Sequence, residues 1–392
     1  MLERARRSRV LSLLSEACEI EHGLACSYLF AAFTLKRGQP EGLSFEQEQL
    51  VRKWAAQISF VATQEMLHLA QAWNLLQAIG GTPYHLHGVF PVERGELEVR
   101  VPMTLEGFSR QTLQRFLSWE RPADLRADRR DFGEPQTTVG RIYAEIERLV
   151  REIPEDSLFI ASRGLQIGPA IADFPDVAPI HDRASACRAI DAIRAQGEGS
   201  PQDRDDCHYG MFHSIALEFE RAVAADSTFE PALAVVANPV RRPSPGGTLV
   251  ADPTTLQVMA LFDDLYGLAI RMLAWVFGAA LPSDVRTRAS ARFAIDVMPV
   301  ALRSLGELLT RMPSGRESLS AGPSFSIARH VPLPEDPRVT MRIVVERARE
   351  IEHDLLDAVG LPKLSSEHAA QLRRTAEKLT VLTSRLIDCG AG

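Results

Sequence analysis

The sequence lacks any apolar run of about 18 residues, which is the length that a membrane-spanning helix needs. Its basic opening, with Arg4, Arg6, Arg7 and Arg9, is not followed by the apolar core of a signal peptide. We therefore expect a cytoplasmic protein without a membrane partner. The formal net charge of −7 provides no basic footprint, so we expect no nucleic-acid partner either.

Cysteine is scarce as well. The 392 residues include five cysteines, an odd number, and no two of them form a CxxC pair. This spacing argues against a disulfide framework and against a zinc knuckle. Only Cys207, which directly precedes His208, remains a functional candidate among the cysteines.

Helical periodicity is the dominant pattern of the sequence, because apolar residues recur every three to four positions along most of the chain. We expect an all-α fold, with one helical bundle in residues 1–238 and a second helical sub-bundle in residues 248–392. The stretch PVRRPSPGG, residues 239–247, is the predicted linker between them. The predicted helices cover residues 2–36, 45–79, 138–153, 183–225 with a break at 196–201, 254–278, 283–311, 340–359 and 365–388.

Residues 84–136 form the longest segment without this periodicity. They are rich in charges and turn formers, and residues 97–101 alternate like a short strand. We expect an irregular segment here, of the kind that shapes a pocket.

Two polar residues interrupt the apolar face of the predicted helix 45–79. Glu65 and His68 lie three positions apart, where leucines are expected, and are therefore neighbours on one helix surface. The predicted helix 2–36 repeats this feature, because Glu21 lies within its apolar stripe. A carboxylate is costly to bury unless it is paired, hydrogen-bonded or bound to a metal.

An inward Glu on one helix and an inward Glu-x-x-His on another are half of the ligand pattern of di-iron carboxylate bundles. Carboxylates can bridge two cations, whereas neutral imidazoles leave coordination positions open. The second half of the pattern has several candidates. Glu145 borders the apolar face of helix 138–153, Glu198 lies between two glycines, and His208 follows. Asp205, three residues before His208, remains an alternative.

Several stretches resemble one known family in order and spacing: EIEHGLACSYLFAAFTL, ATQEMLHLAQAWNLLQAIGGTP, VGRIYAEI, AIDAIRAQGEGS, CHYGMF, ANPVRRP, LFDDLYGLAIRML and AGPSF. They are similar to the ferritin-like domain of the iminophenyl-pyruvate dimer synthases of violacein-type and rebeccamycin-type pathways. The resemblance implies a ferritin-like bundle and a metal-dependent oxidative role in small-molecule biosynthesis. It implies two Fe ions, with Mn as an alternative, held by Glu21, Glu65, His68, Glu198 and His208.

This sequence departs from the family pattern at two places. Asp206-Cys207-His208 stands where Glu-Ser-His is expected, and Ala144 occupies an acidic position, with Glu145 one residue later. Glu145 is therefore our sixth candidate ligand.

Three functions are compatible with these residues. The first is a di-iron enzyme that activates O2 or peroxide and oxidises an amino-acid-derived small molecule. The second is a ferroxidase or metal-detoxification protein, and the third is a pathway scaffold with a decayed site. The partners expected for the first are a small-molecule substrate and O2, and a homodimer is left open.

Overall fold

The computed structural model describes residues 2–85, 89–92, 103–122, 139–160, 166–169, 177–198, 205–278, 285–327, 329 and 331–390. These residues are overwhelmingly helical, so the predicted all-α fold is confirmed. The chain divides into two compact units. The first contains Met1–Leu86, Val92–Gln166 and Val177–Leu233, and the second contains Ala234–Gly392 with the short segments His87–Pro91 and Ile167–Asp176.

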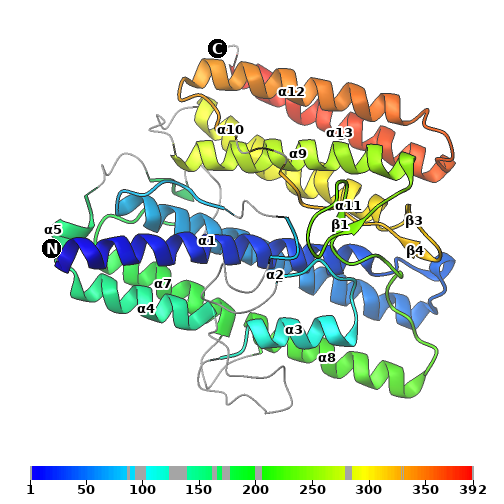
Figure 1. Ribbon diagram of the computed structural model, residues 1–392, viewed down its shortest axis with the longest axis horizontal. Coiled ribbons are helices and arrows are strands. Elements are labelled where there is room, and N and C mark those ends of the chain that lie inside the picture. Colours follow the sequence, from blue (N-terminus) through cyan, green and yellow to red (C-terminus); the bar gives the residue numbers. More distant parts are fainter. Residues whose placement is uncertain are drawn as a thin grey trace. The chain divides into compact units, whose positions relative to one another are not determined.

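The first unit is built on two long helices, α1 and α2, that pack along one another (Figure 1). The N-terminus of α2 carries the capping box that its sequence suggests: the Ser44 side chain accepts from the Gln47 N–H, and the Gln47 side chain accepts from the Ser44 N–H. The elements of this unit are α1 (Leu2–Thr34), a 3₁₀ turn (Gln39–Glu41), α2 (Phe45–Ala78), α3 (Arg110–Trp119), α4 (Val139–Glu152), α5 (Glu155–Leu158), α7 (Arg183–Glu198) and α8 (His208–Ala225).

The remaining long helices of the first unit form two pairs. α4 packs against α1 and α7, whereas α3 packs against α8. In Figure 1 these two pairs lie one after the other along the length of α1. The end of α3, the start of α4, the end of α7 and the start of α8 all line one cavity. Helix ends therefore meet at mid-bundle, where they can present side chains and backbone to a ligand.

The second unit is a mainly helical assembly around α9 that also contains two short strand pairs. β1 and β2 are parallel, whereas β3 and β4 are antiparallel. Its elements are β1 (Pro239–Val240), β2 (Thr248–Leu249), α9 (Pro253–Gly278), α10 (Val285–Val297), a π-helical turn (Met298–Leu302), α11 (Arg303–Leu309), β3 (Pro313–Arg316), β4 (Leu319–Ser320), α12 (Pro337–Ala358) and α13 (Ser366–Gly390).

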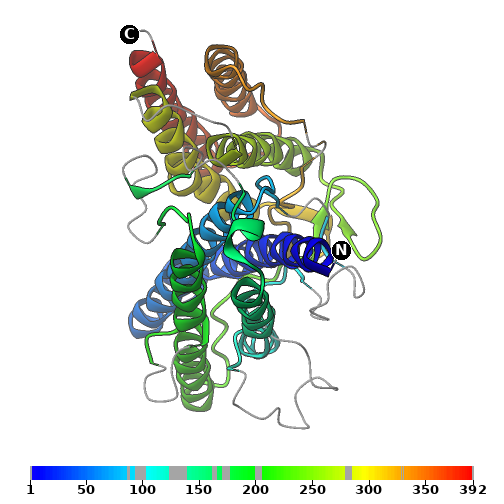
Figure 2. The same ribbon diagram turned by 90° about the vertical axis from the view of Figure 1, so that its left-hand side faces the viewer.

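Helix α9 is apolar on almost every side and packs against α10, α11 and α12, as expected for the central helix of a bundle. α12 and α13 are amphipathic and pack against each other. Figure 2 shows α10 (yellow) alongside α13 (red). Among the described residues, no helix combines the length and apolarity that a membrane span requires.

A buried carboxylate ties three distant segments of the second unit together. Asp263 of α9 is 5% exposed. Its Oδ2 lies 2.7 Å from Nε of Arg241, and its Oδ1 accepts from the hydroxyl of Ser324 at 2.5 Å. Arg241 lies in the segment that we predicted to be a linker, so this segment is anchored within the second unit.

One expectation for residues 84–136 is wrong. Residues 110–119 of this segment form α3, where Ser109 caps the first turn by accepting from the Thr112 N–H. Leu113 and Phe116 face the core, one turn apart. The helix is short, and the charged residues on its outer face obscured its period. The predicted strand at 97–101 lies outside the described residues.

Asp263 makes the stability of the folded protein depend on pH. Burial raises the pKa of Asp263 to about 6, against the opposing effects of Ser324 and Arg241. An aspartate in an unfolded chain has a pKa of about 3.9, so the folded state binds this proton more tightly. The stability that protonated Asp263 adds to the folded state is therefore present below about pH 4 and is lost as the pH rises through about 6. This effect is on the order of 2–3 kcal/mol.

We expect the free energy of unfolding of wild type, relative to Asp263→Asn, to fall between pH 4 and pH 7. Urea unfolding followed by circular dichroism measures this difference. Asp264→Asn is the matched control, because the Asp264 side chain is 43% exposed and pairs with Arg347. A wild-type minus Asp263→Asn difference that does not change with pH would contradict the assignment.

Candidate metal centre

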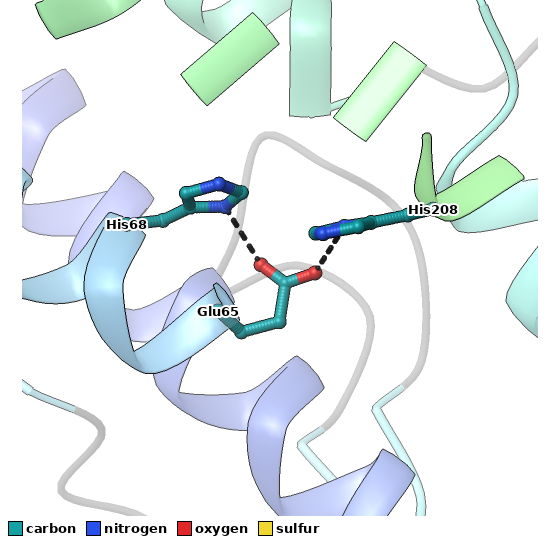
Figure 3. A group of neighbouring side chains, drawn as sticks. All are labelled: Glu65, His68 and His208. Carbon is teal, nitrogen blue, oxygen red and sulfur yellow. Dashed lines mark hydrogen bonds and ion pairs between the residues drawn. The ribbon is translucent and has the colours of Figure 1, made fainter. Parts of the chain in front are cut away.

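A buried carboxylate lies between two imidazoles in the core of the first unit. Glu65 projects from α2 between His68, one turn along the same helix, and His208, the first residue of α8 (Figure 3). Its Oε2 is 3.1 Å from Nδ1 of His68, and its Oε1 is 2.9 Å from Nδ1 of His208. All three residues are at most 4% exposed. Candidate ligand atoms on the three lie within 4.8 Å of one another.

Two further carboxylates flank this group, one on each side. Oε2 of Glu21, from α1, lies 3.6 Å from Nδ1 of His68. Oε2 of Glu120, at the end of α3, lies 3.6 Å from Nδ1 of His208. Each imidazole therefore faces the shared carboxylate of Glu65 and one carboxylate of its own. We call these five residues the carboxylate–histidine cluster.

The outer nitrogens of both histidines are held by amide groups. Nε2 of His68 lies 2.8 Å from Oε1 of Gln196, and Nε2 of His208 lies 3.1 Å from Oε1 of Gln64. An amide oxygen can only accept, so each Nε2 carries a proton. Nδ1 is left facing the carboxylates, as it must if it is to bind a metal ion.

Two buried tyrosines orient the flanking carboxylates in a matched way. The hydroxyl of Tyr143, on α4, donates to Oε1 of Glu21 at 2.7 Å. The hydroxyl of Tyr28, on α1, donates to Oε1 of Glu120. In both glutamates Oε2 is thereby left facing an imidazole. Burial raises the pKa of each tyrosine, and the neighbouring glutamate raises it further, so both phenols stay protonated and act as donors.

The pKa shifts of the glutamates show that nearby positive charge stabilises the cluster. Burial raises the pKa of Glu21 to about 7, and repulsion from Glu65 adds to this. Burial likewise raises the pKa of Glu65, but attraction to His208 and hydrogen bonds from both histidines outweigh it, so the net shift is downward.

The histidines respond in the opposite sense. Burial lowers the pKa of His208, but Glu65 and Glu120 raise it to about 9. The pKa of His68 also lies well above its ordinary value, because Glu21 and Glu65 outweigh burial. These upward shifts favour the protonated form of both imidazoles, whose positive charge offsets that of the carboxylates. Divalent cations would supply the same compensation more strongly.

The residues present fit a metal ion. Among the described residues, Oε2 of Glu21 is a buried atom with no hydrogen bond, whereas Oε1 of Glu65 and Nδ1 of His208 lie 2.9 Å apart and are each other's partner. A buried carboxylate oxygen without a hydrogen bond is rare in folded proteins and calls for a partner. A donor set of carboxylate oxygens and imidazole nitrogens suits iron, manganese and zinc. Glu21 and His68 would hold one cation, Glu120 and His208 the other, and Glu65 would lie between them.

A small cavity of about 20 Å³, room for about one water molecule, adjoins the cluster. Its apolar wall includes Leu24, Val139 and Ile193, and its polar wall includes Trp119 and Arg194.

The structure brings together four of the six ligands predicted from the sequence: Glu21, Glu65, His68 and His208. It does not bring Glu145 to the cluster. The Glu145 side chain is 40% exposed and pairs with Arg148 at 2.7 Å on the outer face of α4. Tyr143 is the residue of α4 that reaches the site. Glu198 is the last residue of α7, and its side chain lies outside the described residues.

Sequence reasoning missed Glu120, although a signal was present. Glu120 follows Leu113 and Phe116 by seven and four positions, which places it on the apolar face of α3. Its 5% exposure confirms that it faces inward. The alternative ligand Asp205 is exposed, and Cys207 caps α8 by accepting from the Gly210 N–H at 3.4 Å.

The first expectation concerns which carboxylates bind metal. Glu65→Ala removes the carboxylate shared by both imidazoles, so we expect it to lose nearly all bound iron. Glu145→Ala should retain the wild-type amount, because Glu145 faces solvent. Elemental analysis after anaerobic Fe(II) loading and desalting measures both. Equal iron in the two variants would place the metal elsewhere.

The second expectation concerns the side-chain amides of Gln196 and Gln64. Gln196→Leu and Gln64→Leu each remove the acceptor of a histidine Nε2–H, and such losses typically weaken metal binding about 10–100-fold. A Co(II) titration followed by visible absorption reports the affinity. Arg188→Ala, at an exposed position of α7, is the control that should bind as wild type. Unchanged affinity in both glutamine variants would show that the amides do not orient the histidines.

Comparison with known proteins identifies the part of the chain that contains the cluster. A family model described as ferritin-like matches residues 14–217, which contain the whole cluster. The dichlorochromopyrrolate synthase of Lentzea aerocolonigenes is 31% identical over 297 residues, covering 68% of this chain and 29% of that protein. The 2-imino-3-(indol-3-yl)propanoate dimerase of Chromobacterium violaceum is 28% identical over 344 residues, covering 81% of this chain and 34% of that protein.

The chain therefore spans about a third of the length of these relatives. A crystal structure of a ferritin-like protein from Caulobacter vibrioides aligns with a TM-score of 0.44 and 16% identity, covering 76% of this chain and 96% of that one. Both curated relatives bear the names of biosynthetic enzymes, as the motifs in the sequence indicated.

Proposed function

This chain belongs to the ferritin-like family, and on that premise we propose that it is a non-haem di-iron enzyme of secondary metabolism. It uses O2 or peroxide to oxidise a small molecule derived from an amino acid. The observation that carries the proposal is the placement of Glu65 between two imidazoles, each with a second carboxylate. This is a donor set for two cations that share one ligand.

Iron bound in this cluster supplies the one-electron and oxygen chemistry that amino-acid side chains lack. The chain's own residues set the conditions for it. Tyr28 and Tyr143 hold the flanking carboxylates in place, and Gln64 and Gln196 hold the imidazoles. Burial of the whole cluster excludes bulk water, which protects a reactive centre from unwanted hydrolysis and proton leakage.

The two curated relatives support the substrate class. One is named for a dimerase of an indole-bearing imino acid and the other for a synthase of a chlorinated pyrrole product. We propose that the substrate here is an aromatic amino acid or its imine. Because the chain matches only about a third of each relative, the dimerisation named for one of them is not carried over.

The scaffold alternative rested on Cys207 and on Ala144. Neither position removes a member of the cluster. Cys207 is a helix cap, and α4 reaches the site through Tyr143 rather than through residue 144. The names of both curated relatives, which are those of enzymes that act on organic molecules, favour an organic substrate over the ferroxidase alternative.

We expect about two irons per chain after anaerobic Fe(II) loading, and an oxygen-dependent change in visible absorption when the loaded protein is mixed with O2. Glu65→Ala should show neither, and Glu145→Ala should show both. Stopped-flow absorption with and without an aromatic amino acid records the reaction. Loaded wild-type protein that gives a featureless trace in O2 would overturn the proposal.

A further inference from the structure

A pocket in the second unit is large enough for a small organic molecule. Its volume is about 400 Å³, whereas the cavity beside the carboxylate–histidine cluster has room for about one water molecule. Pockets that bind small organic ligands typically enclose about 300–1,000 Å³. This pocket lies where the last turn of α9 meets the first turns of α10 and α12.

Hydrogen bonds hold the apolar wall of this pocket in place. Nε1 of Trp275 donates to the carbonyl oxygen of Pro334 at 2.8 Å, and the hydroxyl of Thr340 donates to the same oxygen at 2.6 Å. The hydroxyl of Ser290 lies 3.0 Å from Sδ of Met341. Trp275, Ser290 and Met341 line the pocket and are all buried. Because this wall is ordered before a ligand arrives, binding costs less conformational entropy.

The side chains of this wall favour an aromatic ligand. The indole of Trp275 offers a large, rigid apolar surface against which a second ring can stack. The thioether of Met341 also makes favourable contacts with aromatic rings, because its sulfur is polarisable.

Two arginines give the pocket positive charge. Arg286 is partly buried and Arg338 is exposed, and neither guanidinium forms an ion pair with a residue that the structure describes. Asp336 also lines the pocket, but its Oδ1 already accepts from the backbone N–H groups of Arg338 at 2.8 Å and Val339 at 3.3 Å. A guanidinium binds a carboxylate more strongly than a neutral oxygen, because its hydrogen bonds are then charge-assisted.

We propose that this pocket binds a small aromatic carboxylic acid, with the ring against Trp275 and Met341 and the carboxylate beside Arg286. Arg286 is the expected partner because it is partly buried, so solvent and salt screen its attraction to an anion less than that of exposed Arg338. The site does not depend on the proposed function, since none of the five residues of the cluster lines this pocket.

Calorimetric titration of the full chain with indole-3-acetate and with indole-3-acetamide tests the requirement for charge. The two probes share one ring and nearly one shape, but only the acetate is charged. We expect wild type to bind the acetate about 10-fold or more tightly than the amide. Arg286→Gln should reduce this preference to about 3-fold or less. Arg288→Gln is the matched control on α10 and should keep the preference, because Arg288 is exposed and does not line the pocket.

Methyl NMR shows where the probes bind. The chain contains nine methionines, and Met341 is the one methionine among the described residues that line this pocket. In protein labelled with ¹³C at the methionine methyl groups, both probes should shift the Met341 resonance, because an aromatic ring alters the magnetic field at a methyl group that it contacts. Met341→Leu, a substitution of similar volume that folded cores tolerate, assigns this resonance.

Thermal melting of each variant confirms that it is folded, and Arg286→Met replaces Arg286→Gln if the latter does not fold. No binding of the acetate at millimolar concentration, a shift of other methionine resonances without Met341, or an acetate preference that survives without Arg286 overturns this inference. Each of these results leaves the proposed function intact, because iron loading and the reaction with O2 are measured separately. Conversely, a chain that takes up no iron but shows the expected binding keeps this site and loses the proposed function.

Discussion

The structure of the first unit depends on the burial of Glu65 between two imidazoles. A carboxylate in an apolar core is unfavourable by itself, and two more carboxylates close by would increase that penalty. His68 and His208 compensate this charge, and Tyr28 and Tyr143 satisfy the outer oxygens. Helices α1, α2, α3 and α8 each contribute a member of the cluster, so the packing of the unit and the geometry of the site are one arrangement.

Much of this arrangement could be predicted from the sequence. Glu21, Glu65 and His68 lie on long helices with a clear period of 3.6, so a polar residue on the apolar face is visible without a structure. The ends of these two helices were predicted to within about two residues, because glycine, proline and a capping box mark them. The sequence patterns that predict these two helices are strong, and the helices in the structure agree with them.

The errors arose where local signals were weak. Glu145 borders apolar residues on the sequence, yet one residue corresponds to about 100° on a helix, and that rotation is enough to turn it to solvent beside Arg148. Glu120 was missed because α3 is short and lies in a charged segment. The pairing of Arg241 with Asp263 joins a turn to a helix, which no periodic pattern reveals. Contacts between distant segments of this kind depend on tertiary packing.

The distribution of the cluster along the chain has a consequence for biosynthesis. Glu21, Glu65 and His68 are synthesised early, on the α1–α2 hairpin, whereas His208 comes only after most of the first unit has been made. Until then the inner face of the hairpin carries two carboxylates and a single imidazole, which favours contact with water over burial. A nascent hairpin of this kind is less able to bury that face against a wrong apolar surface, the usual route to aggregation of incomplete chains. The residues that serve the site thus also keep this face of the hairpin polar until the last helix of the first unit has been synthesised.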